Sequence, residues 1–240
     1  MPDAQRGIMS TTKPQTRSGQ SVGSRPEFAW LFASLFFFLL AYPLVNDRGS
    51  VVLDLLFSGM LVAGAYAVSH ERKVLVAALV LAIPTLVFWW SVRIVDSPPL
   101  VFAGLAMSAI FFVFILTLLL RHVIRSRRAN AGTIYAAMSA YLLMGVAWSF
   151  FYAMVEVTTP GAFDFGVLAE HSESYTRHAD LRLFSYYSLV TLSTLGYGDI
   201  TPISPLARSL SSLEAVTGQL FIAVLLARLV GLHVAQHKAN

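Results

Sequence analysis

The sequence predicts an all-α integral membrane protein with six membrane spans. Its 240 residues are 56% hydrophobic and only 12% charged, and the mean hydropathy is +0.67. A soluble domain carries about 25% charged residues, whereas a bilayer core about 30 Å thick is crossed by about 20 apolar helical residues. Six apolar stretches of roughly this length, separated by polar segments, therefore predict six transmembrane helices.

The predicted spans follow a polar N-terminal tail. Residues 1–27 hold Ser, Thr, Gly and Pro without an apolar period, which predicts a disordered segment. The six spans are expected at Phe28–Val45, Val51–Val68, Val74–Val92, Leu100–Leu120, Ile134–Val155 and Ser209–Val230. The first four form a predicted membrane domain over residues 28–128, and the last two belong to a second domain over residues 129–232. Residues 233–240 form a short C-terminal tail.

The basic residues predict how the spans are oriented. If the N-terminal tail is cytoplasmic, the inner segments hold the larger share of the basic residues: Arg6, Lys13, Arg17, Arg25, Arg72, Lys73, Arg121, Arg125, Arg127, Arg128, Arg228 and Lys238. The outer segments then hold only Arg48, Arg93, Arg177, Arg182 and Arg208. The positive-inside rule therefore predicts a cell-membrane protein with both termini in the cytoplasm. This distribution over short loops also argues against a nucleic-acid-binding face.

A re-entrant segment is predicted between the fifth and sixth spans. Asp180–Ser193 reads as a helix capped by Asp180, and its length of about 20 Å is too short to cross the bilayer. The following residues, 194–198, contain glycine at alternate positions, and glycine permits a positive φ. A strand that alternates ordinary and mirror-image conformations turns its carbonyls the same way. Several such strands around an axis would form rings of oxygen that replace the water around a monovalent cation.

The run from Thr191 to Asp199, TLSTLGYGD, resembles the potassium-channel signature T-x-x-T-x-G-Y-G-D. The resemblance is closest over residues 135–230, the two-helix pore module of that family. It implies a homotetramer around a central pore, with K⁺ as the permeant ion, membrane lipid around it and no cofactor. It also implies a selectivity filter formed by Thr194, Leu195, Gly196, Tyr197 and Gly198. The carbonyls of the first four, with the Thr194 hydroxyl, are expected to coordinate K⁺.

The resemblance further implies residues that support this filter. Asp199 is expected to accept a hydrogen bond from Tyr187 of the pore helix, and Thr191 belongs to the same supporting group. Leu195 stands where valine is commonest, which removes the stiffness of a β-branched side chain. Val190 stands where some bacterial relatives carry glutamate, so the support is expected to rest on Tyr187 and Asp199. Interface aromatics are the alternative interpretation of the tyrosines in this helix.

The sixth span offers two further candidates. Gly218 lies where the family carries a hinge glycine in the inner helix, although close helix packing explains such a glycine equally well. Glu214 is an acid within the span and is a functional candidate for that reason. It is otherwise expected to face the pore helix or the outer interface.

The fourth span argues against strong voltage sensing. It contains no charge, and each charge moved through the field contributes only about 2.3 kcal/mol per 100 mV. Arg121, Arg125 and Arg128 follow it at helical spacing, either as a displaced sensor or as a linker on anionic headgroups. In the outer loop, His171 and His178 are candidates for pH sensing, or are simply exposed histidines.

The sequence leaves three functions to distinguish. A potassium-selective channel is the first. A weakly selective monovalent cation channel is the second, if Leu195 and Val190 leave the filter loose. A non-conducting scaffold or regulatory subunit is the third. Ser, His and Asp residues occur without a nucleophile motif, and the chain has no cysteine for a thiolate metal site. The protein is therefore not expected to be an enzyme.

Overall fold

The computed structural model describes residues 26–41, 50–68, 71–92, 94–95, 97–126, 130–166 and 180–238. These residues form seven helices and two short strands: α1 (Pro26–Ala41), α2 (Ser50–Ala67), α3 (Arg72–Ser91), α4 (Pro98–Arg125), α5 (Ala131–Thr158), β1 (Phe163–Asp164), α6 (Leu181–Leu192), β2 (Thr201–Pro202) and α7 (Pro205–Lys238). The expectations for residues 1–25, for Arg128 and for the outer-loop histidines His171 and His178 fall outside the described residues.

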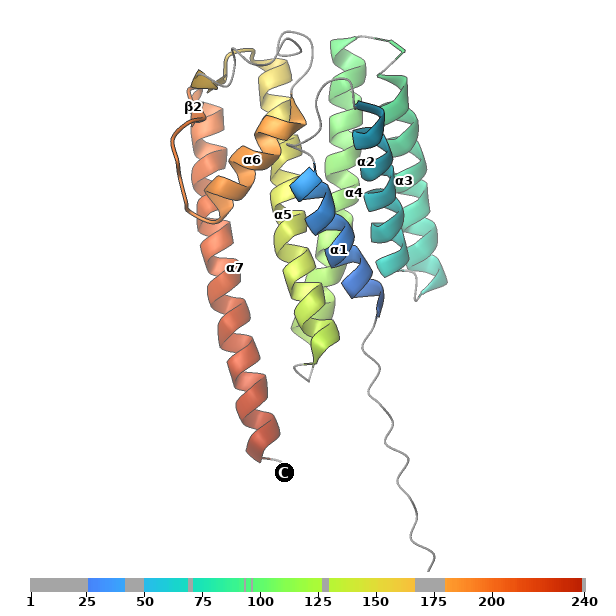
Figure 1. Cartoon of the computed structure of the whole chain (residues 1–240), viewed down its shortest axis with the longest axis vertical. Coiled ribbons are helices and arrows are strands. Elements are labelled where there is room, and N and C mark those ends of the chain that lie inside the picture. The colour runs from blue at the N-terminus through green and yellow to red at the C-terminus, as the bar shows by residue number, and fades with distance from the viewer. Residues whose placement is uncertain are drawn as a thin grey trace, which may run out of the picture.

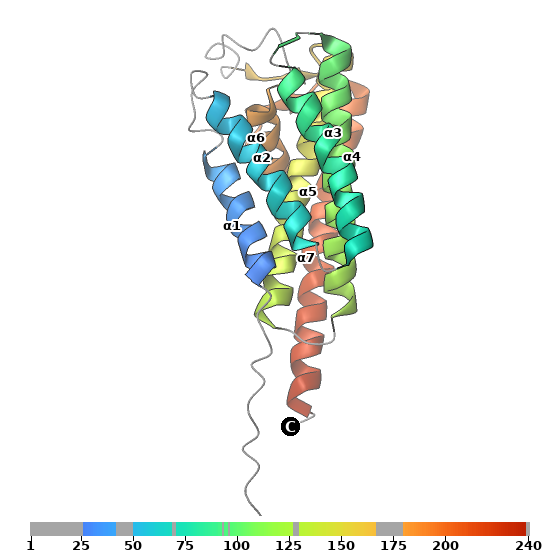
Figure 2. The ribbon, with the colours of Figure 1, turned by 90° about the vertical axis from the view of Figure 1, so that its right-hand side faces the viewer.

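The long helices lie side by side, and α5 is the central one. It packs against α1 and α4 on one side and against α6 and α7 on the other. Figure 1 shows α7 at one edge of the molecule and α2 and α3 at the opposite edge. In the view turned by 90°, α3 and α4 run alongside each other (Figure 2). The start of α1 and the end of α7 lie toward the same end of the molecule (Figure 1).

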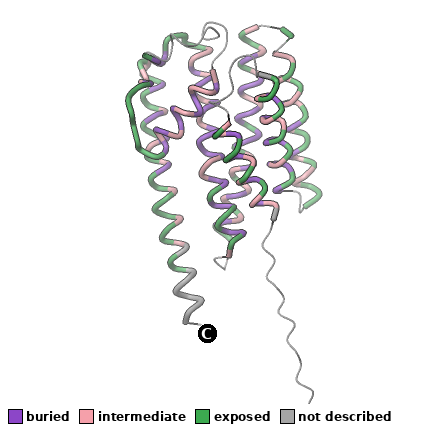
Figure 3. Tube along the Cα trace, viewed as in Figure 1, coloured by how far each residue is buried: buried purple, intermediate pink, exposed green. Residues whose placement is uncertain are grey.

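Four of the predicted spans reach membrane length. The helices Arg72–Ser91, Pro98–Arg125, Ala131–Thr158 and the Pro205–Arg228 part of α7 are each long and apolar enough to cross a bilayer. The first two predicted spans are apolar helices as well, but Glu27–Ala41 and Val51–Ala67 are shorter. Exposed positions alternate with buried ones along these helices (Figure 3). Many exposed side chains are large and apolar, such as Val80 and Val87 on α3, as expected for surfaces that contact lipid.

An acid–indole contact lies in the four-helix domain. Trp89 Nε1 of α3 donates to Asp54 Oδ1 of α2 at 2.7 Å, and the Trp89 ring stacks on Phe57 with 4.0 Å between centroids. From the sequence alone, Arg48 or Arg93 at the outer edge is the expected partner of Asp54, and both arginines lie outside the described residues. The indole N–H and the stacked ring give a polar side chain a defined place among apolar neighbours.

Arg228 connects the lower half of α7 to the end of α4. Its guanidinium donates to the carbonyls of Val123 at 3.1 Å and Ser126 at 2.8 Å, and also to the carbonyl of Ile124. The last carbonyls of a helix have no partner within the helix, and a cation at this end also complements the helix dipole. This contact was not predicted, and it joins the four-helix domain to the inner helix.

A small sheet and an aromatic cluster hold the other end of the pore module. Strands β1 and β2 pair antiparallel, with Phe163 opposite Pro202. Phe163 packs edge-on against Phe184 of α6, at 5.1 Å, and against Tyr152 of α5, at 5.5 Å. The Glu156 carboxylate accepts from the backbone of Gly161 and Phe163, at 2.8 and 3.2 Å. This short sheet was not predicted, and it anchors the segment that follows the predicted filter.

Candidate functional site

The site is built on α6, the short helix that was predicted from residues 180–193. The side chain of Asp180 caps its N-terminus by accepting from the Arg182 amide at 2.9 Å, and Arg182 forms an ion pair with Asp180 at 2.8 Å. The helix then runs obliquely from α5 to α7 (Figure 1). It ends after twelve residues, about 18 Å at 1.5 Å per residue. The predicted helix and its cap are confirmed.

A Schellman motif ends this helix and begins the predicted filter. The Leu195 amide donates to the carbonyl of Val190 at 2.9 Å, and the Thr194 amide donates to the carbonyl of Thr191 at 2.9 Å. In this motif the residue after the C-cap adopts the left-handed conformation and is usually glycine. Here that residue is Thr194, with φ of 58°. A β-branched residue at such a φ is strained by roughly 1–2 kcal/mol, and strain of this kind is concentrated at functional positions.

The backbone of the predicted filter alternates between positive and negative φ. Thr194, Gly196 and Gly198 have φ of 58°, 58° and 79°, and the residues between them are not in the positive region. The positive φ expected at the two glycines is confirmed. That of Thr194 was not predicted, because sequence reasoning assigned the left-handed conformation to glycine only.

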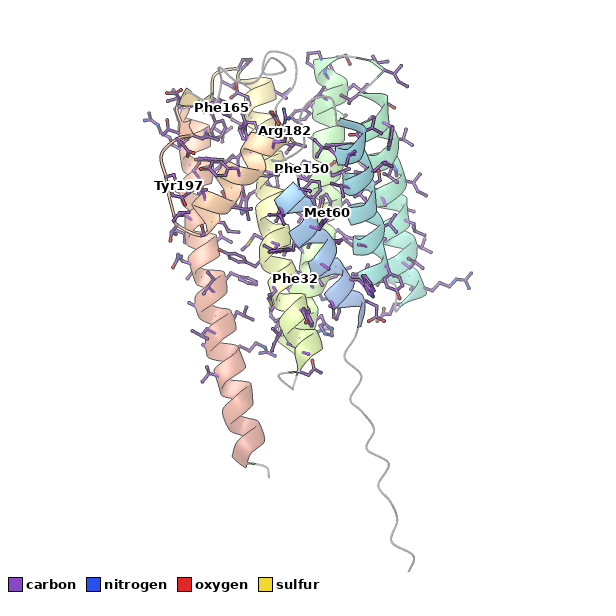
Figure 4. All side chains as sticks on the ribbon, viewed as in Figure 1. Phe32, Met60, Phe150, Phe165, Arg182 and Tyr197 are labelled. Carbon is purple, nitrogen blue, oxygen red and sulfur yellow. The ribbon has the colours of Figure 1, made fainter. Side chains whose placement is uncertain are left out.

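The filter segment is exposed in the single chain. Residues 193–199 are all exposed, including the side chains of Leu195 and Tyr197. A methyl group placed on Gly196 or Gly198 would have no atom within 4 Å. Figure 4 shows Tyr197 on the loop beside α7, at the edge of the molecule opposite α2 and α3. One chain therefore leaves a face of this segment without contacts.

The support of Asp199 differs from the expectation. Tyr186, not Tyr187, donates to Asp199, with 2.5 Å between the hydroxyl and Oδ2. The Tyr187 hydroxyl instead shares a hydrogen bond of 2.6 Å with Ser211 of α7. The predicted Tyr187–Asp199 contact is thus wrong, because neighbouring helical residues point about 100° apart and only Tyr186 faces Asp199. Partial burial, the hydrogen bond and the negative charge of Asp199 raise the pKa of Tyr186 to about 12.

The inner helix α7 touches the filter and the pore helix at three neighbouring positions. A methyl group on Gly218 would lie 2.3 Å from the carbonyl oxygen of Leu192, so this glycine permits a close approach of α7 to the end of α6. Gln219 Nε2 lies 3.3 Å from the Thr194 hydroxyl. Glu214 is completely buried; its carboxyl group accepts from Tyr152 of α5 and lies within hydrogen-bond distance of the Ser188 hydroxyl of α6.

These contacts assign positions that the sequence left open. Of the two interpretations of Gly218, the structure agrees with close helix packing. Helix α7 continues through this residue without a break. Glu214 faces the pore helix. Gln219, Tyr152 and Ser188 were not singled out from the sequence, because a single polar residue in an apolar span carries no signal of its partner.

Comparison with known proteins agrees with this geometry. Residues 129–233 match the family model described as "Ion channel". A segment of 39 residues is 49% identical to the inward rectifier potassium channel Kirbac3.1 of Paramagnetospirillum magnetotacticum, covering 16% of this chain and 13% of that protein's length. No solved structure matches the chain significantly. Ion channels are not a class of enzyme, so this match agrees with the prediction that the protein is not an enzyme.

Proposed function

Because residues 129–233 match the family model described as "Ion channel", we propose that this chain forms a potassium-selective channel that conducts K⁺ passively across the cell membrane. The observation that carries the proposal is the alternating backbone of Thr194–Gly198, placed directly at the end of a helix too short to cross a bilayer. Backbone without regular hydrogen bonds is tolerated at membrane depth only where protein buries it or where it lines a water-filled path.

The working unit in this proposal is a homotetramer. One filter segment cannot enclose an ion, and the exposed face of residues 194–198 supports contact with further copies. Four segments around an axis would present the carbonyls of Thr194, Leu195, Gly196 and Tyr197, with the Thr194 hydroxyl, in place of the water around K⁺. Gly198 completes the turn toward Asp199, which Tyr186 holds from behind.

The topology in this proposal has six spans. Residues 28–128 form a four-helix transmembrane domain that lies outside the pore. Residues 129–232 form the pore domain, and both termini are in the cytoplasm. Helices α1 and α2 are the shorter spans, and a bilayer adapts to a short span by thinning locally. The membrane part of α4 carries no charge before Arg121, so we do not expect strong voltage gating.

Leu195 gives the weakly selective alternative its support. Its side chain is 55% exposed and lacks the β-branching that stiffens a strand. In that alternative the same pore passes Na⁺ and K⁺ at similar rates. The third alternative, a non-conducting subunit, has less support. Such a subunit does not need a positive φ at every second residue from Thr194 to Gly198, two of which are glycines that adopt this φ without strain.

Ion flux into liposomes that contain the purified protein tests the proposal. We expect K⁺ flux far above Na⁺ flux, blocked by Ba²⁺ and lost in Gly196→Ala, because alanine resists the φ of 58° at this position. Gly161→Ala is the matched control, since Gly161 also has a positive φ, 81°, and open space around it, but lies outside the filter. Equal fluxes of the two ions would favour the weakly selective alternative, and no flux in any condition would contradict a homomeric channel.

A further inference from the structure

A carboxyl group is completely enclosed behind the filter. Glu214 of α7 is 0% exposed and lies where three helices of the pore module meet. Tyr152 of α5 donates to its Oε2, and its Oε1 lies 2.5 Å from the Ser188 hydroxyl of α6. An unpaired charge in such surroundings costs several kcal/mol. The group therefore needs either a full set of hydrogen bonds or a proton.

The hydrogen bonds around Glu214 need one proton more than its hydroxyl partners supply. The Ser188 hydroxyl also lies 2.7 Å from the carbonyl oxygen of Gly145, and a carbonyl can only accept. The single Ser188 proton can be donated to only one of these two oxygens, and we assign it to the Gly145 carbonyl. The Tyr152 proton is used on Oε2, so the third contact, between Oε1 and Ser188, requires a proton on the carboxyl group. Tyr152, Glu214, Ser188 and Gly145 then form one chain of hydrogen bonds in which each group is satisfied.

This chain of hydrogen bonds contacts the part of α6 that directly precedes the filter. Ser188 lies one turn before Leu192, whose carbonyl meets Gly218 of α7. Between them, the carbonyl of Val190 accepts the amides of Leu195 and Gly196 in the filter, at 2.9 and 3.3 Å. The position of α6 therefore sets the position of the filter backbone. The Val190 side chain offers no polar contact of its own.

We propose that Glu214, as a neutral carboxylic acid, is a positioning residue for ion selectivity. Its hydrogen bonds fix the position of α6 relative to α5 and α7. The inner helix α7 thereby fixes the position of the filter, which follows α6. The proposal rests on the proposed function, because selectivity is the property that it explains. Tyr187 of α6 lies close by, and its hydroxyl bonds to Ser211 instead, so it does not replace the Glu214 contacts.

The test compares substitutions at Glu214 in the full-length protein. Glu214→Gln keeps the hydrogen-bond pattern of a neutral acid, since its amide group donates to Ser188 and its oxygen accepts from Tyr152. We expect a K⁺/Na⁺ permeability ratio within about twofold of the wild-type value, since a factor of two is worth well under the roughly 1.4 kcal/mol that corresponds to tenfold. Glu214→Leu keeps a similar volume without polar atoms, and we expect its ratio to fall about tenfold, the scale of losing one net hydrogen bond or more.

Milder variants keep the test decisive where Glu214→Leu fails to assemble. Tyr152→Phe and Ser188→Ala each remove one hydroxyl from the chain of hydrogen bonds and should lower the ratio several-fold. Thr217→Val is the control, because among the described residues the Thr217 hydroxyl bonds only to the Leu213 carbonyl of its own helix. Variants that lower thermal stability while the ratio stays unchanged would overturn the positioning role. A ratio lost in Glu214→Gln as severely as in Glu214→Leu would overturn the neutral acid.

Infrared spectroscopy separates this inference from the proposed function. A protonated carboxyl group shows a carbonyl stretching band that is absent from a carboxylate, and the difference between wild type and Glu214→Gln should contain it. The band does not depend on conduction. Its presence in a wild-type protein without selective flux would contradict the proposed function and the role in selectivity while supporting the protonated site. Its absence from a selective wild-type channel would overturn the neutral acid and leave the proposed function intact.

Discussion

The hydroxyl of Tyr186 donates a hydrogen bond of 2.5 Å to Asp199, and this contact joins the two ends of the filter segment. Tyr186 lies on α6, before the filter, and Asp199 follows directly after Gly198. Oδ1 of Asp199 also accepts from the amide of Ile200 at 3.1 Å. The carboxylate therefore fixes the turn that leads from the filter to β2.

Tyr186→Phe should lower the K⁺/Na⁺ permeability ratio several-fold. A hydrogen bond to a charged group contributes about 1.5–3 kcal/mol, and less where water reaches it. The pKa of Tyr186, raised to about 12, keeps its proton in place at physiological pH. The contact is lost only when pH rises through that value, so the ratio should not vary across the physiological range. Bi-ionic reversal potentials measure both effects. A larger effect of Tyr187→Phe would contradict the assignment, since Tyr187 contacts Ser211.

Gly218→Ala should destabilise the protein. The added methyl group would lie 2.3 Å from a backbone carbonyl that cannot turn away, and overpacking of this kind costs about 1–3 kcal/mol. Gly231→Ala on the same helix meets nothing within 4 Å and should be neutral or stabilising by up to about 1 kcal/mol. Thermal unfolding in detergent compares the two variants. A Gly218→Ala protein of unchanged stability but altered open probability would instead favour a hinge.

Gln219→Leu should weaken cation binding at the innermost position of the filter. The Gln219 amide lies 3.3 Å from the Thr194 hydroxyl, and the proposed function makes that hydroxyl a ligand of K⁺. Loss of a neutral hydrogen bond is worth about 1 kcal/mol, which corresponds to a several-fold change in affinity. Block by Ba²⁺ applied from the cytoplasmic side reports this position. The same change in Thr217→Val would show that the effect does not depend on Thr194.

Arg228→Gln should loosen the connection between α4 and α7. The substitution removes a guanidinium that bonds three carbonyls, and we expect a loss of about 1–2 kcal/mol in unfolding free energy together with a changed open probability. Arg208→Gln is the control, because Arg208 bonds one carbonyl, that of Pro202, near the start of the same helix. Single-channel recording and thermal unfolding measure the two effects. An unchanged open probability would mean that the contact only stabilises the fold.

The sequence predicted the parts of the site that are encoded locally. The cap at Asp180, the helix that follows it and the positive φ of Gly196 and Gly198 depend on neighbouring residues. They were therefore recognisable from composition and spacing. Thr194 was missed because its φ of 58° arises from the Schellman motif and is not a preference of threonine.

Contacts between distant residues were not predictable in the same way. Glu214 lies 62 residues from Tyr152 in the chain, and the spacing of either residue does not indicate the other. The choice between Tyr186 and Tyr187 depends on the rotation of α6, which is set by packing against α5 and α7. Arg228 was counted among the cytoplasmic charges, and its bonds to α4 require the tertiary fold.

The Schellman motif connects α6 to the filter without an intervening linker residue. Thr194 is at once the residue that ends the helix and the first residue of the alternating backbone. The amides of Leu195 and Gly196 are tied to a carbonyl inside the last turn. A shift of the helix end therefore reaches the ion-binding backbone undiminished, without a flexible joint to absorb it. Any event that shifts the end of α6 by a fraction of an ångström therefore changes the ion-binding backbone and with it conduction.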